Sequence, residues 1–296
     1  MNNLRPKTFD GIIGQDEIKN IIKIAMESAK QRNDVLPSIA MLGQAGLGKT
    51  TFAEVIANET GRKIHSINGA ALRLIKNIVP HIMRIEYGDI LFIDEIHRSN
   101  STVQEFLYTC VEDYFCIIGS EEDTIRLDIP KFTFIVATTE WGTVLKPLRE
   151  RIKLPLTFCL YQQTDLAKLA CLNSKRLRID IDQDAADSLG KRSRGTPRVL
   201  NRLLEWCRDY AISNSEEKLT IKNVDTALKL LEIDENGFTK DDQRTIMILK
   251  RAKKPIPFRT LSALTGIDEV TLANEVEPFL ISRGIMTKTN RGRILC

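Results

Sequence analysis

Residues 38–51 limit the possible folds of this chain more than any other segment. They read Ser-Ile-Ala-Met-Leu-Gly-Gln-Ala-Gly-Leu-Gly-Lys-Thr-Thr, an apolar run followed by a glycine-rich loop and the beginning of a helical pattern. Gly43, Gly48, Lys49 and Thr50 match the phosphate-cradling pattern G-x-x-x-x-G-K-[ST]. A strand before the loop and a helix after it aim backbone N–H groups and a helix N-terminus at one anion. The segment therefore predicts a nucleotide-binding P-loop in a parallel α/β sheet.

A second motif supplies the acids that such a site needs. Residues 89–95 form a continuous apolar strand that ends in Asp94 and Glu95, which is a Walker-B arrangement. We expect Thr50 and Asp94 to hold Mg²⁺, Lys49 to reach the β- and γ-phosphates of ATP, and Glu95 to polarise the attacking water.

Three further residues are candidates for sensing the nucleotide. Thr139 ends the predicted strand 132–139, which places it at the same edge of a parallel sheet as the other motifs. Arg151 follows on the next loop and is a candidate arginine finger for a neighbouring subunit. Arg198 lies at the predicted start of a helix and is expected to project toward the nucleotide. His97, by contrast, is expected to be an ordinary surface or core histidine rather than a metal ligand.

The order of the predicted elements indicates three domains. Strands alternate with helices over residues 1–160, which predicts a parallel sheet covered by helices, with a hairpin insertion near 115–129. Within this domain a helix is expected to be interrupted near Pro80. Residues 161–233 are expected to contain helices alone and to form a lid. Residues 234–296 show three short helices and a terminal strand–turn–strand, which is typical of a winged helix.

The positive charge of the chain is concentrated near its end. The formal net charge is +4, yet residues 239–296 carry eleven Lys or Arg against six Asp or Glu. Residues 283–293 contain four basic side chains and no acidic one. A protein that grips DNA of any sequence needs phosphate contacts more than contacts to base edges. The candidate DNA-binding residues are Lys288, Arg291 and Arg293.

Composition also argues against several classes of protein. We find no run of about 18 apolar residues that would predict a membrane-spanning helix, and no apolar N-terminal segment typical of a secretory signal. The six cysteines show neither a C-x-x-C pair nor zinc-site spacing, which favours reduced thiols. The expected location is therefore the cytoplasm, with no membrane partner.

These motifs resemble the RuvB family, ring-forming AAA+ motors that drive branch migration of Holliday junctions. The resemblance extends in order along essentially the whole chain. The segments that carry it are residues 4–6, 12–15, 47–51, 88–98, 137–139, 147–151, 192–198, 277–281 and 291–293. The Walker motifs alone indicate a P-loop ATPase, whereas Asp-Glu-Ile-His-Arg, Arg-Gly-Thr-Pro-Arg and the terminal Arg-Gly-Arg are more specific.

The resemblance implies a role for each matching residue. The nucleotide-binding residues would be Leu4, Arg5, Ile13, Gly43, Gly46, Gly48, Lys49, Thr50, Thr51, Tyr161 and Arg198. The catalytic residues would be Lys49, Asp94, Glu95, Thr139 as sensor 1, Arg151 as the trans arginine finger and Arg198 as sensor 2. Lys288 and Arg293 would contact DNA phosphates, with Arg291 nearby.

The resemblance also implies partners and cofactors. The protein would bind ATP and Mg²⁺ and act on duplex or four-way-junction DNA in recombination and repair. It would assemble as a homo-oligomer, expected to be a hexameric ring. The 115–129 hairpin would engage a junction-recognising partner similar to RuvA.

The chain departs from the usual family pattern at four places. It has Gln44-Ala45 where two prolines are usual in the P-loop, and Ile152-Lys153 where Phe-Gly usually follows the finger. The wing, residues 288–293, lacks the usual proline. The turn Glu121–Asp123 is more acidic than usual. These differences favour a divergent member.

Two other functions share many of the same motifs. A clamp-loader-like AAA+ switch would use ATP to control assembly on DNA without translocation, and the terminal winged-helix pattern argues against it. A DNA-binding regulator with a vestigial ATPase is the other alternative. The complete set of Walker, finger and sensor residues argues against that function, since an inactive site has no need of all of them.

Overall fold

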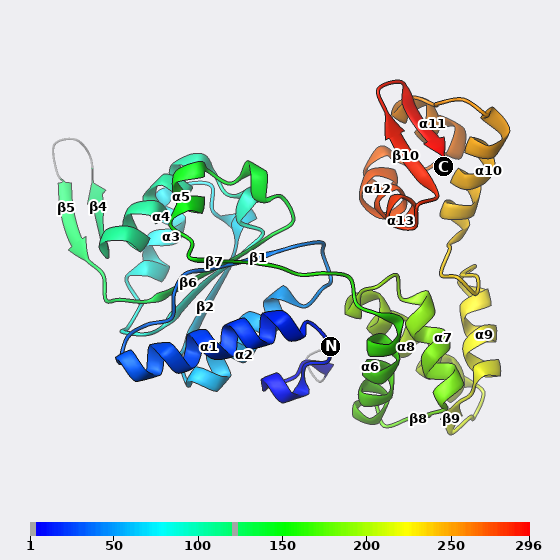
Figure 1. Cartoon of the computed structure of the whole chain (residues 1–296), viewed down its shortest axis with the longest axis horizontal. Coiled ribbons are helices and arrows are strands. Elements are labelled where there is room, and N and C mark those ends of the chain that lie inside the picture. Colours follow the sequence, from blue (N-terminus) through cyan, green and yellow to red (C-terminus); the bar gives the residue numbers. More distant parts are fainter. Residues whose placement is uncertain (1–3, 120–123) are drawn as a thin grey trace. The chain divides into compact units, whose positions relative to one another are not determined.

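The computed structural model describes residues 4–119 and 124–296 and divides into two compact units (Figure 1). The first unit extends to Tyr161 and contains the P-loop and the sheet; the second begins at Gln162 and contains the helical segment and the terminal hairpin. The acidic turn expected at Glu121–Asp123 lies outside the described residues.

A five-stranded parallel sheet forms the centre of the first unit. Its order is β2-β3-β6-β1-β7. The strands are β1 (Ile39–Leu42), β2 (Ile64–Asn68), β3 (Ile90–Asp94), β6 (Thr133–Thr138) and β7 (Leu154–Thr157). The register places Leu42 beside Thr138 and Ile93 beside Val136. The P-loop, the Walker-B acids and the end of β6 therefore meet at the carboxyl edge of the sheet, as predicted.

Helices cover both faces of this sheet (Figure 1). The helices of the first unit are α1 (Asp16–Arg32), α2 (Lys49–Thr60), α3 (Ile75–Ile82), α4 (Ser101–Asp113) and α5 (Lys146–Glu150). Side chains of α1 and α2 share one apolar core with Met41 and Phe92, and those of α3, α4 and α5 share another with Ala40 and Ile93. Burial on both faces explains why the inner strands β1, β3 and β6 are buried without alternation, whereas the edge strands β2 and β7 alternate between buried and exposed side chains.

A separate antiparallel hairpin confirms the predicted insertion. Its strands are β4 (Phe115–Gly119) and β5 (Thr124–Asp128), with Ile117 paired to Arg126. Two large apolar side chains, Ile117 and Ile125, are 54% and 68% exposed on it. They lie on opposite faces of the hairpin, because Ile117 pairs with Arg126 whereas Ile125 pairs with Ile118.

The second unit begins with a helical bundle. Its helices are α6 (Gln163–Arg176), α7 (Gln183–Arg192), α8 (Pro197–Ser213) and α9 (Ile221–Leu230). The expectation of helices alone was wrong in one detail, because β8 (Asp180–Ile181) pairs in parallel with β9 (Lys218–Leu219). These strands are two residues long, too short to give a strand pattern in the sequence, and they join the linkers before α7 and α9.

The end of the chain forms the predicted winged helix. Its elements are α10 (Lys240–Ala252), α11 (Phe258–Thr265), α12 (Glu269–Thr271), the π-helical segment η6 (Leu272–Val276), α13 (Glu277–Ser282), β10 (Met286–Thr289) and β11 (Gly292–Leu295). A bridge between Ile256 and Arg293 adds a third antiparallel partner to the wing. The π-helical segment ends at Val276, two residues before Pro278, whose nitrogen has no hydrogen to donate to a preceding carbonyl.

The helix around Pro80 differs from expectation. The structure has a 3₁₀ turn, η3 (Gly69–Ala71), and then α3, which continues through Pro80 and ends two residues later at Ile82. Pro80 therefore lies within the helix and does not interrupt it. The 3₁₀ turn and the late start of α3 separate the helical pieces instead. Among the described residues, no helix is long and apolar enough to span a membrane.

Candidate active site

The P-loop connects β1 to α2 through backbone conformations that require glycine. Gly43, Gly46 and Gly48 have φ values of 136°, 86° and 96°. A Cβ atom on Gly43 would lie 2.7 Å from the carbonyl oxygen of Phe158. These glycines therefore let the loop follow a path that residues with side chains rarely adopt.

Lys49 begins α2 and is held beneath the loop. Its side chain donates hydrogen bonds from Nζ to the carbonyl oxygens of Gly43 at 2.6 Å and Gln44 at 2.9 Å. The residue is only 6% exposed. Lys49, Thr50 and Thr51 form the first turn of α2, where backbone N–H groups point out of the helix end. The arrangement provides positive charge and several donors for a phosphate.

Thr50 and Asp94 come together although they are far apart in the sequence. Thr50 Oγ1 donates a hydrogen bond to Asp94 Oδ2 at 3.0 Å. A hydroxyl and a carboxylate are hard oxygen donors, and Mg²⁺ is typically bound by one or two such groups together with phosphate and water. These two residues therefore fit a Mg²⁺ ion.

Glu95 occupies a restricted conformation next to this pair. Its φ is 52°, in the left-handed region that non-glycine residues rarely adopt. Gly69 lies against its backbone, since a Cβ at Gly69 would be 2.3 Å from the Glu95 carbonyl oxygen. Thr139 Oγ1 lies 3.5 Å from Glu95 Oε2. The turn that ends β3 thus holds the acid beside the end of β6.

The residues expected around the base have different environments. Leu4 is buried and Ile13 is partly exposed. Arg5 forms an ion pair with Glu54 on α2. Tyr161 donates a hydrogen bond from its hydroxyl to the Leu47 carbonyl oxygen of the P-loop at 3.3 Å.

Arg151 lies at the opposite edge of the sheet from the P-loop. Its carbonyl oxygen accepts a 2.8 Å hydrogen bond from Ser38, which precedes β1, whereas Gly43 follows the end of that strand. Its guanidinium lies 2.8 Å from Glu112 and 3.3 Å from the Tyr108 hydroxyl. The hydrogen bond to Tyr108 and the negative charge of Glu112 raise the pKa of Arg151. The side chain is thus held away from the P-loop of its own chain.

Arg198 belongs to the second unit and is exposed in the first turn of α8. The loop before it is tied to the winged helix. Arg192 donates a 3.0 Å hydrogen bond to the Asp234 carbonyl oxygen, and Arg194 pairs with buried Asp242. The end of α7, the short loop 193–196 and the start of α8 therefore contain the candidate sensor and the side chains that hold the terminal domain.

The candidate DNA-binding residues lie on the wing but differ in their contacts. Arg293 pairs with Glu277 through two contacts of 2.9 and 3.3 Å and stacks over the Phe258 ring at 4.5 Å. Lys288 lies 3.2 Å from the same carboxylate. Arg291, on the exposed turn, has no side-chain partner among residues 4–119 and 124–296. Arg291 is therefore the most available of the three cations.

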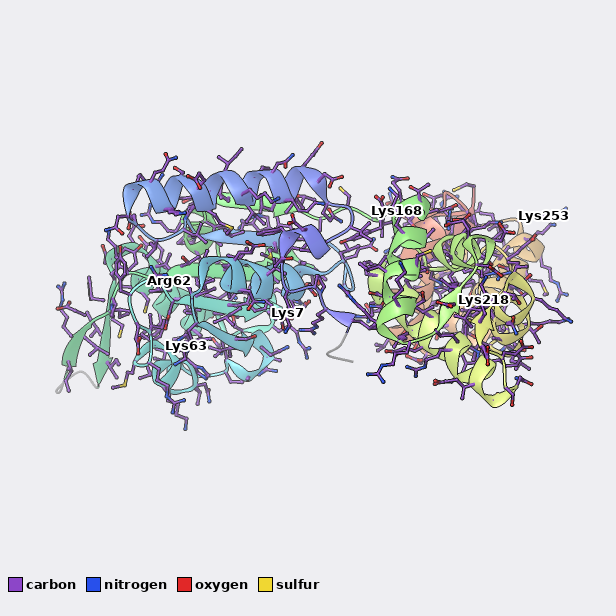
Figure 2. The ribbon with its side chains drawn as sticks, turned by 90° about the horizontal axis from the view of Figure 1, so that it is seen from below. Lys7, Arg62, Lys63, Lys168, Lys218 and Lys253 are labelled. Carbon is purple, nitrogen blue, oxygen red and sulfur yellow. The ribbon has the colours of Figure 1, made fainter. Side chains whose placement is uncertain are left out.

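Other basic side chains lie outside the wing. In Figure 2, Lys7, Arg62 and Lys63 are on the first unit and Lys168, Lys218 and Lys253 are on the second. Some of this charge is compensated locally, as at Lys218, which lies 2.5 Å from Asp182. Basic side chains are thus distributed over both units.

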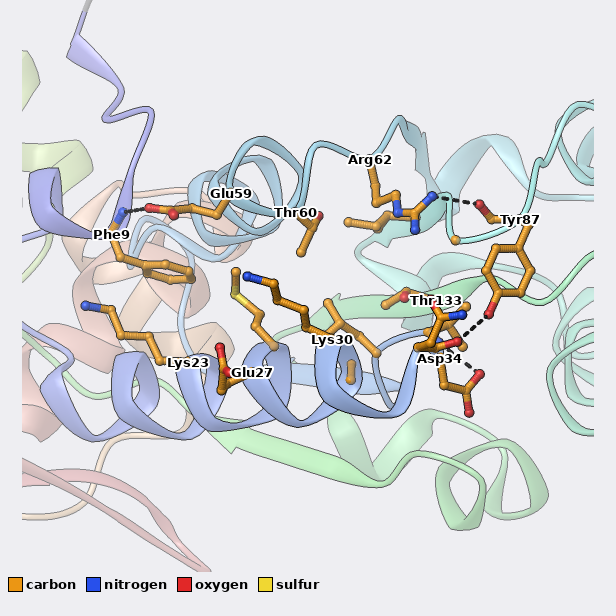
Figure 3. A pocket seen from close by; sticks show the side chains of 17 residues that line it. Phe9, Lys23, Glu27, Lys30, Asp34, Glu59, Thr60, Arg62, Tyr87 and Thr133 are labelled. Atoms are coloured by element: carbon orange, nitrogen blue, oxygen red, sulfur yellow. Dashed lines mark hydrogen bonds between the residues drawn. The ribbon is translucent and has the colours of Figure 1, made fainter.

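A cavity of about 680 Å³ lies away from the P-loop (Figure 3). Lys23, Glu27 and Lys30 line it from α1, while Ile90 and Thr133 mark the amino ends of β3 and β6. Ligands of open α/β sheets bind at the carboxyl ends of strands. Because this cavity is at the other end, we do not assign the nucleotide to it.

Sequence reasoning missed the residues that support the site. The contact of Gly69 with Glu95 depends on β2 lying beside β3, and the contact of Glu112 with Arg151 depends on α4 lying beside α5. Neither contact could be predicted from a pattern in the sequence. For His97 the expectation was an ordinary surface or core histidine rather than a metal ligand, and the sequence does not indicate that its ring lies 3.3 Å from the Glu95 carboxylate.

Comparison with known proteins identifies the same domains throughout the chain. The Holliday junction DNA helicase RuvB P-loop domain matches residues 4–158, the RuvB AAA lid domain residues 161–234, and the RuvB C-terminal winged helix domain residues 235–296. The Holliday junction branch migration complex subunit RuvB of Staphylococcus haemolyticus is 38% identical over 98% of this chain and 90% of its own length.

Solved structures agree with this match. The Thermotoga maritima RuvB Holliday junction branch migration motor superimposes with a TM-score of 0.87 at 34% identity, covering 99% of this chain and 96% of its own. A single-residue variant of that protein gives 0.89 with the same identity and coverage. The P-loop, the paired Thr50 and Asp94 and the terminal winged helix occur in this order within matches that span nearly the whole sequence. The chain belongs to the RuvB family.

Proposed function

We propose that this protein is an ATP-hydrolysing motor that drives branch migration of four-way DNA junctions, working as a homo-oligomeric ring on duplex DNA. The proposed domains are an ATPase core at 1–160, a lid at 161–233 and a DNA-binding winged helix at 234–296. The proposed location is the cytoplasm, because such a motor needs ATP and DNA in one compartment.

The contact between Thr50 and Asp94 is the observation that carries the proposal. It joins the P-loop to the Walker-B strand at 3.0 Å. Lys49 precedes Thr50 and Glu95 follows Asp94, so phosphate binding and water activation converge at one sheet edge. A site that only bound nucleotide would not need Glu95 there.

The residues divide the proposed chemistry between them. The P-loop N–H groups and Lys49 bind and orient the phosphates, and Glu95 holds the attacking water in line with the γ-phosphate. Mg²⁺, held by Thr50 and Asp94, would neutralise charge that develops on the phosphate oxygens. We assign Thr139 to sensing the γ-phosphate, and Leu4, Arg5, Ile13 and Tyr161 to binding the adenosine moiety.

The position of Arg151 supports a ring. The strand from Ser38 to Gly43 separates its backbone from the P-loop by roughly 16 Å at about 3.3 Å per residue. An arginine so placed can complete the active site of a neighbouring copy, in a head-to-tail interface that closes into a ring. A hexamer is the proposed size.

The loop before α8 offers a route from nucleotide to DNA. We propose that Arg198, in the first turn of α8, senses the nucleotide, while Arg192 at the end of α7 and Arg194 in the loop between these helices bind the segment that begins the winged helix. Movement of this loop would then move the DNA-binding domain. Lys288, Arg291 and Arg293 are proposed to face DNA phosphates.

The hairpin of β4 and β5 is the proposed contact for a RuvA-like junction-binding protein. Ile117 and Ile125 expose apolar surface on it. These two side chains lie on opposite faces of the hairpin, and the proposal rests on them together with the family to which the chain belongs.

The proposal is tested by measuring ATP hydrolysis with and without a synthetic four-way junction. The wild type is compared with Lys49→Ala, which removes phosphate binding, and Glu95→Gln, which keeps the shape of the side chain but removes its charge. We expect hydrolysis that rises with the junction and is lost in both variants. Glu95→Gln should still bind ATP. Wild-type protein should also convert the junction to duplex products with ATP.

Tight DNA binding controlled by ATP, without turnover or junction conversion, would contradict the motor. That result would favour the clamp-loader-like switch. DNA binding that is insensitive to both ATP and Lys49→Ala would instead favour a regulator with a vestigial ATPase.

A further inference from the structure

His97 occupies a fixed position between two strand ends of the active site. Its ring lies with Nδ1 2.9 Å from Thr138 Oγ1 and 3.3 Å from Glu95 Oε2. On its other side, Nε2 is 3.8 Å from Glu140 Oε1. The side chain is only 11% exposed. Nδ1 therefore faces the Walker-B acid and the end of β6 together.

The backbone around His97 keeps the ring in this place. The left-handed conformation of Glu95 ends β3 and begins the 3₁₀ turn η4 (Ile96–Arg98). Ile96 is completely buried, and its carbonyl oxygen accepts hydrogen bonds from both the backbone and the side chain of Ser99, at 3.0 and 2.7 Å. A short turn anchored at both ends leaves the ring little freedom to move.

Thr138 extends this arrangement to the P-loop. Its side chain is buried, and its Oγ1 also accepts a 2.9 Å hydrogen bond from the Glu140 N–H. Its carbonyl oxygen accepts a 3.2 Å hydrogen bond from the Gly43 N–H. A continuous series of contacts thus leads from the first glycine of the P-loop through Thr138 and His97 to Glu95.

The contacts engage one oxygen of the Glu95 carboxylate. His97 and Thr139 both approach Oε2, whereas Oε1 has no hydrogen-bond partner in the part of the chain that the structure describes. A carboxylate that activates water must present one oxygen at a defined place while its rotation is restrained. Fixing Oε2 leaves Oε1 to accept a proton of the attacking water.

We propose that His97 is a positioning residue for ATP hydrolysis, which orients Glu95 through Nδ1 and links that acid to the end of β6. This inference rests on the proposed ATPase and adds a residue to its machinery. In this role His97 would not itself bind the nucleotide or the attacking water. It acts through Glu95.

Two substitutions at His97 distinguish the role of Nδ1 from that of Nε2. His97→Asn places its amide near the position of Nδ1, whereas the longer side chain of His97→Gln places its amide near Nε2. We expect His97→Gln and His97→Ala to lower kcat by about 10- to 100-fold, a range typical of groups that orient a reacting centre from outside it. His97→Asn should recover most of that loss.

The kinetic constants distinguish positioning from simple structural support. The KM for ATP and the affinity for a fluorescent ATP analogue should stay unchanged in all three variants, because an interaction needed only for the chemical step lowers kcat alone. His81→Asn provides a matched control, since it makes the same substitution on α3, away from the site. Melting temperatures of all variants should be compared before rates are interpreted.

The possible outcomes distinguish a failure of this inference from a failure of the proposed ATPase function on which it rests. A wild type that binds ATP without hydrolysing it would overturn the motor and this role together. Normal hydrolysis in the wild type with equal rates in Asn, Gln and Ala variants would overturn the role of His97 alone. Parallel losses of ATP affinity and melting temperature in all three variants would also overturn it, because they would indicate structural support.

Discussion

Ser38 donates a 2.8 Å hydrogen bond to the carbonyl oxygen of Arg151, which fixes the candidate finger at the amino edge of the sheet. The P-loop is at the carboxyl edge, beyond the other end of β1. The two groups cannot meet in one chain while this sheet is intact. In the proposed trans role they would meet across an interface between copies.

Mixing two inactive variants tests this consequence. Arg151→Ala keeps its own P-loop, and Lys49→Ala keeps its finger. Each should lack ATPase activity alone, but an equal mixture should regain activity, because about a quarter of randomly formed head-to-tail interfaces combine an intact P-loop with an intact finger. A mixture as inactive as its components, although it forms mixed oligomers, would contradict action in trans.

Gly69→Ala should slow ATP hydrolysis without touching a reacting group. The added Cβ would lie 2.3 Å from the Glu95 carbonyl oxygen, so the turn that carries the acid must shift. Displacements of about 1 Å in an active site can cost about 100-fold in rate. We expect kcat to fall by at least tenfold while ATP affinity is largely kept. Gly142→Ala is the matched control, since a Cβ on Gly142 would have no neighbouring atom within 4 Å and the rate should stay near wild type.

The sequence predicted those features whose residues lie close together along the chain. The P-loop and the Walker-B strand were recognised correctly because each is encoded within one short segment whose residues act together. The parallel sheet followed from the alternation of strands and helices. The lid strands β8 and β9 were missed because two residues produce no pattern, and Pro80 was expected to interrupt the helix that in fact contains it.

The contacts around the acid could not be predicted, for a physical reason. His97 meets Thr138 only because β3 and β6 are neighbours in a particular register. The same applies on the wing, where Glu277 lies on a helix and Arg293 on a strand sixteen positions later. Such pairings depend on how the folded elements pack, and the spacing of residues along the sequence does not predict them.

Arg291→Ala should weaken DNA binding by removing a contact to phosphate, without changing any preference for DNA sequence. Arg291 is exposed on the wing turn, so its loss should reduce affinity similarly for all duplex sequences and lower the slope of log K against log salt by about 1. Arg293→Ala is a less specific test, because it also removes a partner of Glu277, which is only 2% exposed. Binding titrations over a range of salt on two unrelated duplexes would measure both effects. A loss confined to one duplex would indicate base recognition.

The buried pair of Arg194 and Asp242 should govern the stability of the junction between lid and winged helix. Asp242 is completely buried, and Arg194 stacks over Phe279 at 4.1 Å while it pairs with the carboxylate. Arg194→Met would keep much of the stacking volume but leave a buried charge without its partner. We expect a loss of about 3–5 kcal/mol in the free energy of unfolding at pH 7. Arg194→Met combined with Asp242→Leu should be more stable than Arg194→Met alone.

The same pair predicts a dependence on pH with a definite sign. Burial raises the pKa of Asp242 above its ordinary value even with Arg194 present, and removing that positive charge should raise it further. A carboxyl whose folded-state pKa is raised binds its proton more tightly when folded, so it contributes stability at low pH that is lost as pH rises through the folded-state pKa. The deficit of Arg194→Met relative to wild type should therefore shrink between pH 7 and pH 5. Denaturant unfolding at both pH values measures it, and a deficit that grows on acidification would show that Asp242 is not the group left unpaired.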